Sequence, residues 1–356
     1  MSFLKKQKTR KALSTLESRM GAELPTELVT LMEASDALQV GPCRFSDPEV
    51  VGSLSARLPS WPPELIPFAA ASAEWFCLMR VDGQPPSSWP VMLAIANPPA
   101  VVPVASNFRG FLFFIGLHYT DSAYLGKDGE LAKRLMADLG VSQTILETPV
   151  PPTKMPEENL KYDKAALVPQ CILALRQTRA QDGPALAARS LLTLAKGTPW
   201  WGAPHHLLAR LYTQMGNVVN TCGCYWNAIE RANVYSGFSS RPQLADVGIA
   251  RTAEMQAVAF LREHEAHVPE QLKTLPRWHW LVKAVDVQDI GARVDLARRY
   301  VSIEQWERAL WAFMDALAVA ERDADAAGLV LQEMSMIYDT LGRPYEASVC
   351  RSSVVA

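Results

Sequence analysis

The chain has 356 residues, of which 49% are hydrophobic and 20% charged, so it can bury a large core and is long enough for two domains. Its 35 Lys and Arg residues nearly balance its 37 Asp and Glu residues, which leaves a formal net charge of -2. No overall field therefore attracts nucleic acid or an anionic membrane, and we expect neither as a partner.

The first residues, "MSFLKKQKTRKAL", are basic, but no apolar signal segment follows them. The longest apolar run, "FLFFIGL" at 111–117, is far too short for a membrane span. The cysteines are also too few and too scattered for a disulfide scaffold in so long a chain. We predict a cytoplasmic protein with reduced thiols.

The N-terminal half predicts an α+β domain with a mainly antiparallel sheet. "ELPTELVTLMEAS" indicates a helix, and "LIPFAAASAEWFCLMRV" and "PVMLAIANPP" indicate short strands rich in apolar residues and turn formers. "AVVPVASNFRGFLFFIG" begins as a strand and becomes helical after Ser106, which we expect to be the N-cap. We interpret scattered acidic residues as solvated surface; they include Asp36, Asp47, Glu49 and Glu64.

The order of these pieces resembles the SUKH superfamily, also called the SMI1/KNR4 family, over roughly residues 13 to 120. The matching stretches are Leu24-Pro25 with Leu28 and Leu31, "LIPF" at 65–68, "WFCLMRV" at 75–81, Pro90-Val91 and "SNFRGFL" at 106–112. The family is widespread among immunity proteins of bacterial toxin systems. The resemblance implies a SUKH-like fold and binding of a toxin. This chain has "AAASAE" where family members usually carry a turn rich in Gly and Asp.

A proline-rich stretch, "ETPVPPTKMPEEN" from Glu147, separates this half from an Ala- and Leu-rich half that is typical of helices. We predict a domain at 1–147, a linker at 148–165 and a helical repeat domain at 166–356. Because prolines stiffen an extended segment, we expect few contacts to cross it and residues 1–147 to fold alone.

The C-terminal half repeats itself. Two helical hairpins have small and large apolar residues at a constant offset from each other: Leu208, Ala209, Tyr212, Tyr225 and Ala228 in one, and Leu296, Ala297, Tyr300, Phe313 and Ala316 in the other. Small residues let a neighbouring helix approach closely, and large ones fill the space one turn later. Stacked hairpins bury faces that one hairpin alone leaves exposed.

This pattern resembles the tetratricopeptide repeat, which recurs about every 34 residues. Further units begin near Val168 and Gly328, the first with Ala174, Leu175, Ala187, Leu191 and Pro199, and the last with Met334, Ser335, Tyr338, Gly342 and Ala347. Arg351 departs from the pattern, which indicates a capping helix. We expect a TPR-like solenoid, with a divergent helical pair at 236–289.

Cys222 and Cys224 lie at the start of the second helix of one repeat, where packing favours small residues. We interpret them as packing residues, because no CxxC, second cysteine pair or HExxH lies nearby. A metal or redox pair is the alternative, and we predict no metal and no cofactor.

The repeat register also predicts a binding surface. By resemblance to the family, the residue after each small packing position faces the concave groove; these residues are Arg176, Arg210, Arg298 and Met336. His206 also lines this groove in our interpretation, and Trp61 and Trp75, near prolines or strand starts, are interface anchors. Ordinary exposed helix positions and core packing are the alternatives. Guanidinium groups on one face favour an acidic segment of a partner.

We find no nucleophile elbow, P-loop or dinucleotide motif, so we expect a binding protein and not an enzyme. The leading hypothesis is an immunity protein that neutralises a cognate bacterial toxin through protein-protein interaction. The alternative is an adaptor or regulatory scaffold that holds a peptide or protein in the repeat groove.

Overall fold

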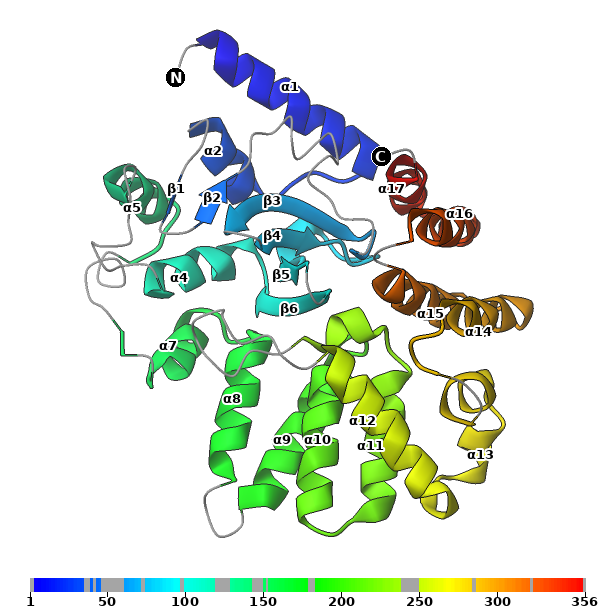
Figure 1. Cartoon of the computed structure of the whole chain (residues 1–356). Helices are drawn as coiled ribbons and strands as arrows, with labels where there is room; N and C mark the ends of the chain where they lie inside the picture. The colour runs from blue at the N-terminus through cyan, green and yellow to red at the C-terminus, as the bar shows by residue number, and fades with distance from the viewer. Residues whose placement is uncertain are drawn as a thin grey trace.

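The computed structural model describes residues 3–34, 39–40, 43–45, 61–71, 74–96, 99–118, 129–142, 150–151, 153–178, 183–237, 250–283, 286–320 and 323–354. A sheet with helices comes first along the chain, and a long succession of helices follows it (Figure 1). This order confirms the predicted α+β region and the helical region after it. Within the described part of the chain, no helix combines the length and apolar character needed to cross a membrane.

The described strands form one antiparallel sheet whose strand order follows the chain order. Pro103 lies in β6, an edge strand, where the missing backbone N–H is tolerated. The strands are β1 (Gln39–Val40), β2 (Cys43–Phe45), β3 (Leu65–Ala71), β4 (Glu74–Met79), β5 (Val91–Ile95) and β6 (Ala100–Ala105). A short 3-10 helix, η1 (Pro86–Ser88), lies between β4 and β5.

Both faces of the sheet are buried, each in a different core. Because successive side chains of a strand point to opposite faces, Phe76 and Leu78 of β4 enter one core and Cys77 and Met79 enter the other. The first core includes residues of the N-terminal helices, and the second includes residues of the C-terminal helices. The N-terminal region contains α1 (Phe3–Met20), α2 (Thr26–Ala34), α4 (Phe108–His118) and α5 (Gly129–Asp138).

The C-terminal helices follow one another as packed neighbours and curve around the sheet, so that α17 ends close to α1 (Figure 1). Antiparallel pairs are formed by α8 with α9, α10 with α11, α14 with α15, and α16 with α17. Their bounds are α8 (Leu167–Gln177), α9 (Gly183–Gly197), α10 (Ala203–Gln214), α11 (Val218–Ile229), α14 (Ile290–Ser302), α15 (Trp306–Val319), α16 (Ala324–Thr340) and α17 (Pro344–Ser353).

Three of these pairs share a left-handed turn between their helices. Gly216, Glu304 and Gly342 have φ of 70°, 57° and 69°, and they occupy corresponding positions of their units. The predicted small packing positions Ala209, Ala297 and Ser335 are all buried. These three helical pairs therefore have the same turn conformation and the same buried small position.

Between the second and third of the regular pairs lies a less regular segment. It contains η2 (Asn233–Ser236), α12 (Ala250–Glu263), η3 (Glu265–His267), α13 (Glu270–Lys273) and η4 (Trp278–Lys283), a π-helical turn. The helix α12 supplies one helix of the divergent pair predicted at 236–289, and residues 238–249 lie outside the described residues.

The expectation that few contacts cross the proline-rich stretch is wrong. The core on the second face of the sheet joins Leu65 and Met92 to Phe313 and other residues of the helical array. Tyr345 and Val349 of α17 also belong to the core that contains α1. In addition, the predicted linker at 148–165 contains a helix, α7 (Met155–Tyr162), which begins with Pro156 in its first turn, where a missing N–H is tolerated.

The start of α4 also differs from the prediction. Asn107, and not Ser106, caps the helix, since its Oδ1 accepts a hydrogen bond from the backbone N–H of Gly110 at 2.8 Å. Ser106 instead donates its N–H and its hydroxyl to the two carboxylate oxygens of Asp163, at 2.8 and 2.6 Å. This contact fixes the sheet to the segment between α7 and α8.

Candidate functional site

The three predicted arginines lie at the protein surface, but two of them contact carboxylates of this same chain. Arg298 donates through Nε and Nη2 to Glu333, with Nη2 2.6 Å from Oε1, and so joins α14 to α16. Arg176 lies 2.7 Å from Glu157 of α7. Arg210 of α10 is exposed. Two of the three predicted arginines, Arg176 and Arg298, thus form ion pairs within the chain, and their contact with a partner stays a prediction.

Two of the other predicted contact residues, His206 and Trp61, lie inside the molecule. The exposed fraction is 3% for His206 and 1% for Trp61, so neither presents a surface to a partner in this structure. Trp61 contributes to the core between the sheet and the helical array, and the half-buried Trp75 packs against the same core. His206 packs edge-on against Tyr225 of the neighbouring helix. Burial lowers the pKa of His206 to about 4.

Cys222 and Cys224 are buried in α11, as the packing interpretation predicts. Burial raises the pKa of the Cys224 thiol to about 12 and also raises that of Cys222. A protonated thiol is a poor nucleophile and a poor metal ligand. The described residues contain no group of three or more His, Cys, Asp or Glu placed to hold a metal ion.

Glu64 is buried and not solvated, which corrects the sequence interpretation. Glu64 lies directly before β3, and its Oε1 accepts a hydrogen bond from the Tyr338 hydroxyl of α16 at 2.7 Å; Arg343 lies 3.4 Å from the same oxygen. Arg343 also contacts Glu346 at 3.0 Å, and Arg80 reaches the same carboxylate at 2.8 Å. These charges couple the sheet to the last helical pair.

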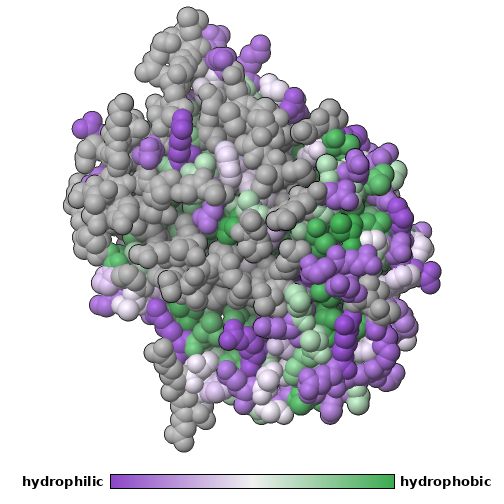
Figure 2. All heavy atoms as spheres, in the orientation of Figure 1, coloured by the Kyte–Doolittle hydropathy of each residue, from purple (hydrophilic) through white to green (hydrophobic). Residues whose placement is uncertain are grey.

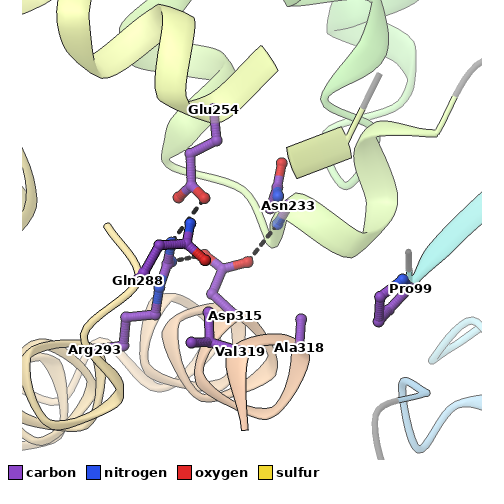
Figure 3. Close-up of a pocket in the computed structure, with 8 residues that line it drawn as sticks. All are labelled: Pro99, Asn233, Glu254, Gln288, Arg293, Asp315, Ala318 and Val319. Carbon is purple, nitrogen blue, oxygen red and sulfur yellow. Dashed lines mark hydrogen bonds and ion pairs between the residues drawn. The ribbon is translucent and has the colours of Figure 1, made fainter. Parts of the chain in front are cut away.

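A buried charge cluster, defined as Glu254, Arg277, Arg293 and Asp315, joins α12, α14 and α15 to the residue before η4. Figure 3 shows Glu254, Arg293 and Asp315 of this cluster. Arg293 lies 2.7 Å from Glu254 and 3.5 Å from Asp315, which Arg277 also approaches at 3.5 Å. The backbone N–H of Asn233 donates to Asp315, so the cluster also holds η2 in place. Two guanidinium groups and two carboxyl groups thus lie against each other away from water.

Burial, followed by the nearby Glu254 carboxylate, raises the pKa of Asp315 to about 7. The cavity beside the cluster has a volume of only about 20 Å³, enough for about one water molecule. The ion pairs of the cluster hold these helices together.

A larger concavity opens where the two halves of the chain meet. The junction cleft, with a volume of about 610 Å³, is lined by Asp82 from the loop after β4 and by residues at three helix ends of the array; these are Gln305, Trp306, Glu307, Arg308, Leu310, Leu341 and Arg343. Its size lies within the range of ligand pockets. Apolar and charged side chains share its wall.

A second exposed feature is the α14–α16 surface, which we define as Arg298, Leu329, Glu333 and Met336. The α16 residues are four and three positions apart in turn, so they lie on one face of the helix. Leu329 and Met336 are 63% and 57% exposed, one on each side of the ion pair of Glu333 with Arg298. Figure 2 shows hydrophobic side chains among hydrophilic ones on one face of the molecule.

Sequence reasoning missed the burial of Glu64 and the buried charge cluster, because the interacting residues are far apart along the chain. One signal was available for Asp315. It is the only charged residue within "ALWAFMDALAV", the apolar run that forms most of α15. A single carboxylate within a mostly buried apolar run requires a partner, although the sequence does not say which.

Comparisons with protein-family models, with curated proteins and with solved structures found no match to this chain.

Proposed function

We propose that this chain is a non-catalytic protein that binds another protein, and that it acts in the cytoplasm as an immunity protein that neutralises a cognate bacterial toxin. The order of α2, β3 to β6 and α4 supports the SUKH resemblance of the N-terminal half. The paired helices and their shared left-handed turns support the tetratricopeptide resemblance of the rest.

The observation that carries protein binding is the α14–α16 surface. Leu329 and Met336 expose large aliphatic side chains beside an ion pair that itself faces solvent. Methionine and arginine are enriched in protein interfaces, where apolar centres are surrounded by polar groups. Grouped exposed apolar side chains on a helical array also favour a helical or extended protein segment as the occupant.

The positions of the arginines still predict that the partner carries an acidic segment. At Arg298 such a segment would have to displace Glu333, which already satisfies two guanidinium donors. At Arg210 no such displacement is needed, because no ion pair forms there within the described residues. Arg210→Glu is therefore expected to weaken binding to an acidic partner more than Arg298→Glu does.

The test is to co-express the chain with a toxin encoded by the adjacent gene and to measure growth and affinity. We expect growth to be restored and the purified proteins to associate. Leu329→Asp together with Met336→Asp is expected to weaken the association about tenfold to a hundredfold. Val219→Asp on α11, which also replaces an exposed aliphatic side chain, serves as the matched control.

Binding without protection of the cells would favour the adaptor or scaffold hypothesis. If the chain neither binds the product of the adjacent gene nor restores growth in its presence, the immunity proposal fails. If the double variant binds as tightly as the unaltered chain, the α14–α16 surface is not the contact.

A further inference from the structure

The junction cleft has a feature that the α14–α16 surface lacks: both halves of the chain build it. Asp82 follows β4 of the sheet, Trp306 begins α15, and Leu341 follows the end of α16. A partner that occupies the cleft therefore contacts the sheet region and the helical array at once.

The two arginines of the cleft are already compensated by carboxylates of the chain. Arg308 donates through Nη1 to the Gln305 side chain at 2.7 Å, and its Nη2 lies 3.3 Å from Glu230. Arg343 lies between Glu64 and Glu346, at 3.4 and 3.0 Å. Glu230 offsets the charge of Arg308, and Glu64 and Glu346 offset that of Arg343, so less of the positive charge is available to a ligand.

The acidic groups of the cleft are in the opposite situation. Asp82 and Glu307 are exposed, and neither forms an ion pair within the part of the chain that the structure describes. Glu304, on the left-handed turn directly before the cleft residue Gln305, is also exposed. The charge available at the rim is therefore negative.

The apolar wall suits a side chain with an aliphatic stem. Leu310 is buried and Trp306 is half-buried, whereas Leu341 is exposed. Lysine and arginine lay their methylene groups on apolar surfaces and keep the charged group in water, and an indole ring attracts a cation placed over its face. A carboxylate at the rim could then receive the charged group.

We propose that the junction cleft receives a lysine or arginine side chain of the partner protein, with the stem against Trp306 and Leu341 and the charge near Asp82 and Glu307. This inference rests on the proposed protein-binding function and names the chemistry of one contact. The cleft is a second contact, separate from the α14–α16 surface.

The probe is the blocked tripeptide acetyl-Leu-Arg-Leu-amide, compared with the same peptide carrying neutral citrulline in place of arginine. Calorimetric titration of the full chain is expected to show tighter binding of the arginine peptide. Asp82→Asn together with Glu307→Gln is expected to reduce that preference about tenfold, since both exposed ion pairs with the peptide are lost. Glu263→Gln, which replaces an exposed carboxylate of α12, is the matched control and is expected to leave it unchanged.

Equal binding of the two peptides, tighter binding of acetyl-Leu-Glu-Leu-amide, or no binding at millimolar concentration would each overturn the inference. Trp306→Leu, which retains an apolar side chain, is expected to weaken the binding of the arginine peptide more than that of the citrulline peptide. If a toxin is neutralised equally by the Asp82→Asn, Glu307→Gln variant, the cleft inference fails and the proposed function stands. If the protein binds the arginine peptide more tightly than the citrulline peptide but neutralises no toxin, the proposed function fails and the cleft site stands.

Discussion

Glu304 occupies a backbone conformation that glycine adopts in two other helical pairs of the same chain. Its φ of 57° lies in the left-handed region, as do the φ values of Gly216 and Gly342 at the corresponding turns. Left-handed backbone costs an L-residue about 1–2 kcal/mol. We therefore expect the substitution Glu304→Gly to stabilise the protein.

The size of the effect follows from two opposing terms. Replacing Glu304 removes about 1–2 kcal/mol of conformational strain, while glycine loses about 0.5–1 kcal/mol more backbone entropy on folding. The expected net gain therefore lies between about 0 and about 1.5 kcal/mol, with a midpoint of about 0.7 kcal/mol. The reverse changes, Gly216→Ala and Gly342→Ala, are expected to cost about 1 kcal/mol each. A Cβ there would meet no other atom within 4 Å, so the cost is conformational and not steric.

Equilibrium unfolding in urea, followed by circular dichroism, measures these differences as shifts of the transition midpoint. Gly223→Ala is the matched control, because Gly223 lies inside α11 with helical backbone and open space for a Cβ. That change is expected to stabilise the protein by about 1 kcal/mol. A destabilised Glu304→Gly variant, alongside the expected losses at Gly216 and Gly342, would refute the reasoning and assign a stabilising contact to the Glu304 carboxylate.

The remaining predictions concern the boundary and the buried titratable groups. A fragment that ends at Glu147 is expected to aggregate or to bind a hydrophobic dye, since it lacks the helices that cover one face of its sheet; a soluble fragment with cooperative thermal unfolding would contradict this. Burial lowers the pKa of His206 to about 4, so the unfolded chain takes up this proton first and stability falls as the pH drops from about 6.5 to 4. His206→Phe is expected to reduce this loss of stability at low pH, as measured by urea unfolding at several pH values. An unchanged pH dependence would contradict the claim that His206 is buried in its neutral form. For Asp315 the pH dependence of stability has the opposite sign. Because its pKa is raised to about 7, the folded state takes up the proton first, and stability rises as the pH falls from about 7 to 4. Asp315→Asn is expected to remove that rise, and NMR titration that found this carboxyl ionised at pH 5 would oppose it.

The sequence determines the local elements of this protein. The strands at Leu65–Ala71 and Val91–Ile95 follow from β-prone apolar runs between turn residues, and α10 and α11 follow from a helical spacing of small and large residues. These signals depend on neighbours within a few positions along the chain. The same is true of Gly216 and Gly342, which mark turns with left-handed backbone.

Only the tertiary structure decides what covers each element. Nothing near Trp61 in the sequence shows that the helical array buries it, and nothing near Arg298 shows that Glu333 compensates its charge. From the sequence alone, Glu64 is expected at the surface; in the folded protein, Tyr338, which is far along the chain, donates a hydrogen bond to it. Burial and ion pairing depend on residues brought together by folding, and each partner looks ordinary in its own stretch of sequence.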